Sequence, residues 1–352
     1  MVPTNDHPSR SFLFDGKTSG IVLPKLKQLP KPGYTCCLWV CPYNFSEGTN
    51  EQGGHRRSNS ASRMGSVSNR LNTAPAWKAG KSSDQRPTVL FSCKTGAKAG
   101  LEILSDNGTI CIAIGQLGTP MASRKVINTN TILETHSWSF ISMSHSQRSK
   151  FLSSGNNFTL YKNGKAIWKG VVKYTTGKVR DHVHHSLGFS DTQQYRQTPA
   201  TAKYKGLIGS FNMFCEPLSS GAIRSIFNIG YNYIGCFDQS ESDIRMLSKA
   251  AAPGSFQPEM LCKSLLMSFH PGVSKNLRAN VSVGNKDALS ISVLPAISPV
   301  VDPSIFVKEP KRKALDDRLW CKCLPGTRSI VWTNVRDVLK SLGGINVLLP
   351  VF

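Results

Sequence analysis

The clearest pattern in the sequence is a succession of short segments in which large apolar residues alternate with polar ones. Leu101 and Ile103, and then Ile110, Ile112 and Ile114, alternate in this way, so one face of each segment packs inward. The pattern predicts strands over 34–45, 88–94, 100–106, 109–115, 138–145, 158–162, 165–174, 184–190 and 206–214. Many short strands without helical segments between them indicate a mainly β fold, an antiparallel β-sandwich of two packed sheets.

Two Asn-Gly pairs, Asn107-Gly108 and Asn163-Gly164, lie between predicted strands. A type I′ hairpin turn needs positive φ at both central positions, which Asn and Gly tolerate best. In the second hairpin, the predicted cross-strand pairs are Lys162 with Lys165, Tyr161 with Ala166, Leu160 with Ile167, and Thr159 with Trp168. This register places Leu160 and Ile167 on one side and Tyr161 and Trp168 on the other.

A helix is predicted within 216–232, where Ser219-Ser220 can cap the start, Ile223, Ile226 and Phe227 follow helical spacing, and Gly230 can end it. The sandwich is therefore expected over 8–237, closed by this short helix. It is interrupted at 46–87 by a polar insertion too poor in large apolar residues to fold.

The remainder of the chain is predicted to be an irregular, Pro-rich connecting segment over 238–330, with short helices at 241–250 and 258–271. Residues 331–352 are expected to begin an α-helical, armadillo-like repeat region, because Val335, Val338, Leu339 and Leu342 mark one helical face. The apolar end of the sequence suggests a piece of something longer.

The charge is strongly positive: 43 Lys+Arg against 21 Asp+Glu give +22, and residues 88–237 alone carry 16 basic and six acidic residues. Such a field attracts phosphate on nucleic acid or on an anionic membrane, or it is only a solvated basic surface. The absence of an Arg-rich run or an RNA-binding aromatic motif argues against nucleic acid. No stretch is long enough to span a bilayer, no signal peptide is seen, and the ten cysteines are expected to be reduced in the cytosol.

The sequence offers little that could carry catalysis or bind a metal. His184 and His185 in DHVHH would point to opposite faces of a strand, so they cannot share a metal, although Asp181 and His182 could add ligands; we expect surface histidines rather than a zinc site. Cys321 and Cys323 are too close for a zinc loop. The six carboxylates of 88–237 never come in pairs, which argues against a calcium site or a glycosidase. Trp138, Tyr161, Trp168 and Tyr233 are read as core aromatics rather than a stacking platform. We therefore expect no enzyme activity, no metal and no cofactor.

Several motifs together resemble a known family. The run Trp138-Ser-Phe-Ile141, His145 and Leu160-Tyr161-x-Asn163-Gly164-Lys165 is similar to the signature of concanavalin A-like (laminin-G- and pentraxin-like) sandwiches. Segments 33–40, 205–233 and 335–352 resemble, more narrowly, the version of this jelly roll found in BEACH-domain scaffold proteins of the neurobeachin class; Tyr231 departs from the usual Pro. The positions carried over as scaffold are Trp39, Trp138, His145, Tyr161, Asn163, Gly164, Gly206, Gly209, Phe214, Gly230 and Tyr233.

The resemblance implies a non-catalytic, lectin-like interaction module in a large cytoplasmic scaffold, peripheral to endomembranes and acting in vesicle trafficking, lysosome biology or autophagy. Its partners are expected to be proteins, an anionic membrane surface and the rest of a longer chain; retained sugar affinity is left open. The candidate basic surface consists of Lys162, Lys165, Lys169, Lys173, Lys178, Arg180, Lys203 and Lys205. The alternatives are an extracellular laminin-G- or pentraxin-type glycan- or heparin-binding domain and a charge-driven nucleic-acid binder.

Overall fold

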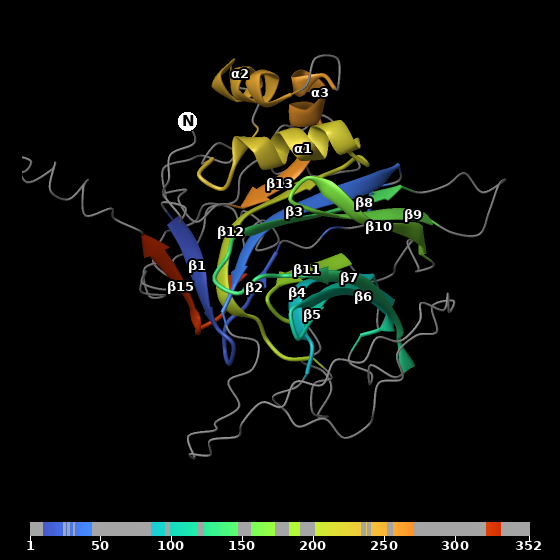
Figure 1. Cartoon of the computed structure of the whole chain (residues 1–352), viewed down its shortest axis with the longest axis vertical. Helices are drawn as coiled ribbons and strands as arrows, with labels where there is room; N and C mark the ends of the chain where they lie inside the picture. Colours follow the sequence, from blue (N-terminus) through green and yellow to red (C-terminus); the bar gives the residue numbers. More distant parts are fainter. Residues whose placement is uncertain are drawn as a thin grey trace, which may run out of the picture.

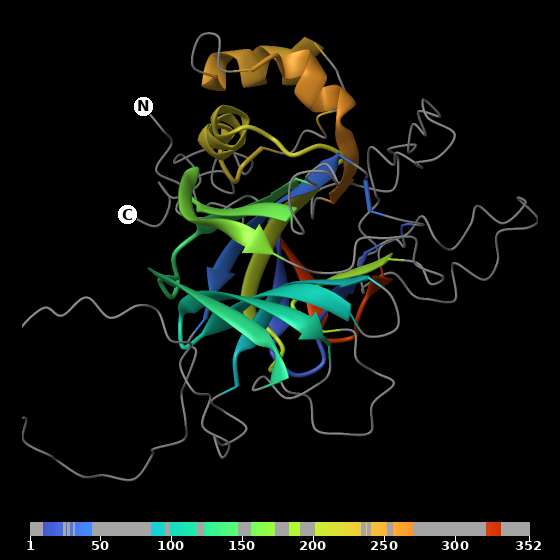
Figure 2. The same cartoon turned by 90° about the vertical axis from the view of Figure 1, so that its right-hand side faces the viewer.

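Two antiparallel sheets stack face to face, and three short helices cover the outer face of one of them (Figures 1 and 2). The expected fold class, a mainly β sandwich with a short closing helix, is confirmed. The computed structural model describes residues 10–23, 26, 29–30, 32–43, 86–95, 99–117, 123–146, 156–172, 183–190, 201–233, 237, 241–251, 256–269 and 322–331. The expected insertion at 46–87 lies almost wholly outside these residues, and the predicted repeat region at 331–352 lies outside them except for Val331.

The eight-stranded sheet runs in the order β10 (Lys165–Val172), β9 (Asn156–Lys162), β8 (Ser139–Ser146), β3 (Gly33–Pro42), β12 (Lys205–Phe214), β1 (Arg10–Asp15) and β15 (Thr327–Val331), and β13 (Leu265–Phe269) also pairs with β12. The seven-stranded sheet runs in the order β14 (Lys322–Cys323), β2 (Ile21–Val22), β11 (Val183–Leu187), β4 (Thr88–Thr95), β5 (Ala99–Asp106), β6 (Thr109–Gln116) and β7 (Lys125–Ile132). Neighbouring strands within both sheets pair antiparallel.

The main core fills the space between the sheets, as the alternating pattern predicts. Ile103 pairs with Ile112 across β5 and β6, and both face Phe211 and its neighbours from the other sheet. A small void between the described strands has a volume of about 10 Å³ and is lined by apolar side chains, including Phe91 and Phe211. This is barely the space that one water molecule needs. This void is therefore too small for a ligand.

Helix α1 (Ser220–Ile229) forms where the sequence predicts it and creates a second apolar layer. The Ser219 hydroxyl accepts a hydrogen bond from the Ala222 N–H at 3.2 Å, and the chain leaves the helix at Gly230, which has φ 90°. Ile223 and Ile226 are buried in the cluster that contains Trp39 and other side chains on the outer face of the eight-stranded sheet. This packing, more than helix propensity, stabilises so short a helix.

Residues 238–330, expected to be irregular, contribute regular structure. Helix α2 (Glu241–Ala250) agrees with the predicted helix at 241–250. The helix predicted at 258–271 is only partly present, because α3 (Pro258–Lys263) ends early and the chain continues as β13. Residues 265–268 are buried on both strand faces, and Met267 pairs with Met213 of β12. A continuous apolar run does not distinguish strand from helix, which explains the error.

The N-terminal and C-terminal segments of the described chain pair with each other along one side of the sandwich. The chain passes from β1 in one sheet to β2 in the other, and β14 and β15 follow the same path in reverse beside them. The Thr327 hydroxyl joins the two segments, because it donates to the Gly20 carbonyl at 3.0 Å and accepts from the Gly20 N–H at 2.9 Å. The described sandwich thus extends beyond residue 237.

Candidate interaction surface

The predicted basic surface divides into two groups in the structure. Lys162, Lys165 and Lys169 lie on the β9–β10 hairpin, at one edge of the eight-stranded sheet. Lys203 and Lys205 lie at the start of β12, and the Lys203 ammonium is 5.9 Å from the centre of the Phe189 ring. Lys173, Lys178 and Arg180 lie outside the described residues. Three strands, β9, β8 and β3, lie between β10 and β12, so the five described lysines do not form one patch.

The hairpin that carries the first group is held rigidly. Asn163 and Gly164 have φ 50° and 73°, as the predicted type I′ turn requires. The Asn163 side-chain oxygen accepts from the Phe140 N–H at 2.8 Å, and the Asn163 N–H donates to the Phe140 carbonyl at 2.8 Å. The Lys162 ammonium donates to the Ile132 carbonyl of β7 at 2.6 Å. Lys162 therefore links the two sheets, while Lys165 and Lys169 are exposed.

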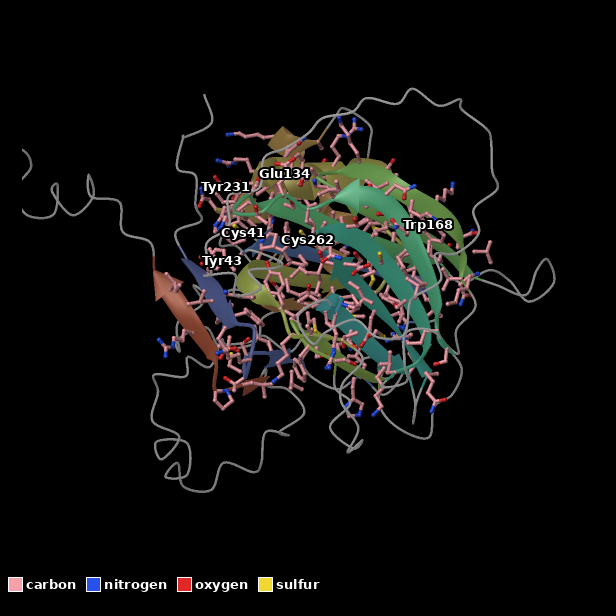
Figure 3. All side chains as sticks on the ribbon, turned by 60° about the horizontal axis from the view of Figure 1, so that its bottom comes forward. Cys41, Tyr43, Glu134, Trp168, Tyr231 and Cys262 are labelled. Carbon is pink, nitrogen blue, oxygen red and sulfur yellow. The ribbon has the colours of Figure 1, made fainter. Side chains whose placement is uncertain are left out.

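One part of the predicted hairpin register is wrong. Lys165 pairs with Lys162 and Ala166 with Tyr161, but the register then shifts, so that Trp168 pairs with Leu160. The shift is a bulge that leaves Ile167 without a single opposite partner. As a result, Ile167 and Trp168 both pack against the main core, and Trp168 lies near Phe158 rather than on the side of Tyr161. Figure 3 shows Trp168 at the sandwich edge.

The second group, with Lys205, lies beside an aromatic cluster at one end of the sandwich. Here we define the aromatic end as Tyr43, His136, Trp138 and Tyr231. Tyr43 stacks on His136 at 5.1 Å between ring centres, and Trp138 stacks on Tyr231 at 6.0 Å. The Tyr43 N–H donates to the Lys205 carbonyl at 3.1 Å.

Rings of the aromatic end remain partly accessible: Tyr43, Trp138 and Tyr231 are half-buried and His136 is exposed. Figure 3 shows Tyr43, Cys41, Tyr231 and Glu134 together at this end. The sequence reading considered Trp138 but missed its neighbours, because Tyr43, His136 and Tyr231 meet only through strand pairing and the end of α1.

The other transferred scaffold positions have structural surroundings. Trp39, His145, Tyr161 and Phe214 are buried, and Tyr233 is half-buried beside Phe237, at 4.7 Å between ring centres. Gly206 has φ 146° and lies so close to the Cys41 carbonyl that a Cβ would be 2.5 Å from its oxygen. Gly209 lies beneath Trp39 and Trp138, where a Cβ would be 3.1 Å and 3.5 Å from them. These contacts show that the transferred scaffold positions have packing roles in the sandwich.

A buried ion pair on the outer face of the seven-stranded sheet was not foreseen from the sequence. Arg124, just before β7, reaches across β6 to Glu102 on β5, with 2.7 Å between Nη1 and Oε2, and both side chains are almost fully buried. The Ser92 hydroxyl of β4 donates to the other Glu102 oxygen at 3.2 Å. Ala113 pairs with Glu102 across the sheet, so a small residue lies beneath the bridge. Because its charges compensate each other, this pair is a structural feature of the sheet.

The histidine prediction is half right. His184 and His185 point to opposite faces of β11, but His185 is only 1% exposed, so it is not a surface residue. It packs near Phe91 of the core, and burial, helped by the neighbouring His184, lowers the pKa of His185 to about 3. Burial also lowers the pKa of His145 to about 4. Both imidazoles are therefore neutral at physiological pH.

The remaining chemistry is also structural within the described residues. The eight cysteines there are thiols without disulfides, and burial raises the pKa of Cys37 and Cys93 to about 12, so they are not nucleophiles. The described residues contain no group of three His, Cys, Asp or Glu side chains that could hold a metal ion. No described helix is long and apolar enough to cross a membrane.

No protein-family model matches the sequence, and no curated protein matches it. Solved structures with a similar arrangement include a heptameric SAP-like pentraxin from Limulus polyphemus, with 12% identity, a TM-score of 0.36, and coverage of 64% of this chain and 85% of the pentraxin chain. Domain 4 of the extracellular arabinanase AbnA from Geobacillus stearothermophilus, in complex with arabinotriose, has 16% identity, a TM-score of 0.37, and coverage of 61% and 75%.

Mouse laminin α1 domains LG4-5 have 10% identity and a TM-score of 0.36, and the match covers 62% of this chain but only 46% of the laminin chain. At such low identities and TM-scores these structures carry no argument about function.

Proposed function

We propose that this chain is a non-catalytic interaction module that binds anionic partners through the β9–β10 hairpin. The observation that carries the proposal is the charge of this side of the sandwich: β7, β9 and β10 contain Lys125, Lys162, Lys165 and Lys169 and no acidic residue. Apolar side chains pack between the two sheets, and the exposed lysines lie outside this core. Exposed lysines on a rigid hairpin attract anionic groups with little ordering cost.

The proposal places the module in a large BEACH-class scaffold, in the cytoplasm at the surface of endomembranes, with a role in vesicle trafficking, lysosome biology or autophagy. The support for this finer assignment is the order of the sequence motifs around Trp138, Asn163 and Gly230. Reading the coding sequence that follows residue 352 for BEACH and WD40 segments tests it directly; a different set of domains there would contradict it.

Binding to an anionic surface can be measured by co-sedimentation with vesicles that contain phosphatidylserine, compared with phosphatidylcholine alone, at low and high salt. We expect salt-sensitive binding to the anionic vesicles. The double variant Lys165→Glu/Lys169→Glu should lose most of it. The control Lys17→Glu/Lys249→Glu has the same change of net charge at exposed positions away from the hairpin and should retain binding. Equal loss in both variants would refute a localised surface.

A second candidate function, glycan binding, is favoured by the aromatic end. Partly accessible Trp138 and Tyr231 rings offer apolar surfaces of the kind on which sugars stack, and Glu134 is exposed nearby. Titration with oligosaccharides, followed by tryptophan fluorescence, should distinguish wild type from Tyr231→Ala if this site is used. An extracellular form of this function would further require most cysteines to be oxidised, which a thiol titration under denaturing conditions decides.

A further inference from the structure

We propose that β10 accepts an extended acidic segment of a partner protein as an additional strand of the eight-stranded sheet. This inference rests on the proposed function and names the partner and the way it binds. An extended peptide that adds to a sheet edge gains affinity from main-chain hydrogen bonds and specificity from alternate side chains. The structural requirement is an open edge, which β10 provides among the described strands, since it pairs there only with β9.

The two lateral sides of the sandwich differ. On one side, the β1–β2 and β14–β15 segments run along both sheets and join them. On the other side, β10 ends the eight-stranded sheet and β7 ends the seven-stranded sheet, and each pairs with a single described strand. Figure 1 shows β10 and β7 on the same side of the molecule. With eight residues, β10 is long for an edge strand.

The register shows which backbone groups of β10 are available. Antiparallel partners alternate between hydrogen-bonded and non-hydrogen-bonded pairs, and the residues that flank a two-residue turn form a hydrogen-bonded pair. Beyond the bulge, Lys169 is opposite Thr159 and Val171 is opposite Asn157, both in non-hydrogen-bonded positions. The N–H and C=O groups of Lys169 and Val171 therefore point away from β9, toward an incoming strand.

The side chains around this edge select an acidic partner that also carries apolar residues. Lys165 and Lys169 are exposed on β10 itself, and Lys125 is exposed on the adjacent edge strand. Val171 is 43% exposed and Ile132 is 62% exposed, and both are among the four large apolar residues that the described chain leaves in solvent. A segment that carries both acidic and apolar residues matches both features.

A second copy of this chain does not fit the same edge. Antiparallel pairing of two β10 strands would bring lysines together, and like charges on neighbouring strands are destabilising. The bulge at Ile167 also interrupts the flat edge that self-pairing needs. The features that prevent self-association are thus compatible with an acidic strand that pairs beyond the bulge.

The test uses the full chain and a fluorescent eight-residue peptide of alternating Glu and Val, the length of β10. We measure fluorescence anisotropy at low salt, with an alternating Lys and Val peptide as the control. Lys165→Glu/Lys169→Glu should weaken binding by at least about tenfold, and Lys17→Glu/Lys249→Glu should not.

A second experiment tests the main-chain hydrogen bonds. N-methylation of alternate peptide residues removes hydrogen bonds on one edge of the peptide only. One methylated series should therefore lose at least about tenfold in affinity, and the complementary series should bind normally.

The Val171→Pro variant tests the protein side, since it removes one outward N–H and edge strands tolerate proline. It should weaken peptide binding while keeping the thermal unfolding midpoint near that of wild type. If that variant misfolds, the methylated peptides with wild-type protein still decide the question. If binding is salt-sensitive but equally strong for both methylated series, strand addition is wrong and the proposed binding of anionic partners to the lysine surface stands. Binding to phosphatidylserine vesicles without binding to the peptide would lead to the same conclusion. Failure of both the peptide and the vesicles to bind would overturn the proposed function itself.

Discussion

Because two histidines are buried, we predict that the free energy of unfolding falls as the pH is lowered from 7 to 5. Burial holds the pKa of His145 at about 4 and that of His185 at about 3, below the value of about 6.5 expected in the unfolded chain. The unfolded state therefore binds protons that the folded state does not, so stability is complete above pH 6.5 and is lost progressively below it. At pH 5 the penalty is about 2 kcal/mol for each histidine, or about 4 kcal/mol together.

Urea denaturation at pH 7, 6 and 5, followed by tryptophan fluorescence, measures this loss. The matched variant is His185→Leu, because His185 lies against Phe91 and neither of its ring nitrogens has a hydrogen-bond partner among the described residues. The variant should be at least as stable as wild type at pH 7, since it removes two buried polar atoms, and should lose only about half as much free energy of unfolding by pH 5. Full pH dependence in His185→Leu would refute the assignment of a neutral, buried imidazole.

Three further outcomes follow from contacts described above. Arg124→Met should destabilise the protein by about 3–5 kcal/mol, because it leaves Glu102 charged and buried, while Arg124→Met/Glu102→Met should recover most of the loss in a double-mutant cycle by urea denaturation. Thr327→Val should cost about 1–3 kcal/mol of unfolding free energy, because the buried Gly20 N–H loses its acceptor, while the Gly20 carbonyl keeps the hydrogen bond from the Leu324 N–H; an unchanged midpoint would contradict that role. Asn163→Ala should lower stability by about 1–3 kcal/mol, measured by thermal unfolding, because alanine disfavours the positive φ and lacks the side-chain acceptor.

The elements that the sequence predicts well are those fixed by local signals. Asn107-Gly108 and Asn163-Gly164 specify their turns through backbone conformation alone, and α1 begins and ends at Ser219 and Gly230 as expected. The missed elements depend on distant partners. β7 reads as polar, with Asn or Thr at four of its eight positions, and becomes a strand because β6 offers a pairing edge. β15 is fixed by β1, more than 300 residues away.

For the same reason, only the part of the candidate surface that lies close together in the sequence could be predicted. A hairpin brings Lys162 and Lys165 together, so sequence proximity suffices for that group. The separation of Lys205 from them, and its place beside Tyr43, depend on the strand order β12, β3, β8, β9. The bulge that turns Trp168 toward the core departs from the ideal register of a two-residue hairpin. It could therefore not be predicted from the turn alone.

The pairing of β1 with β15 has a consequence for synthesis on the ribosome. The Gly20 to Thr327 contact spans 307 residues, which take roughly 15–60 s to translate at about 5–20 residues per second. One edge of β1 can pair with β12 once residues 205–214 have been synthesised, but the outer edge has no partner until β15 follows more than 100 residues later. The nascent protein therefore spends many seconds with the outer edge of β1 unpaired. A chaperone that binds this strand during synthesis would protect the unpaired edge from aggregation.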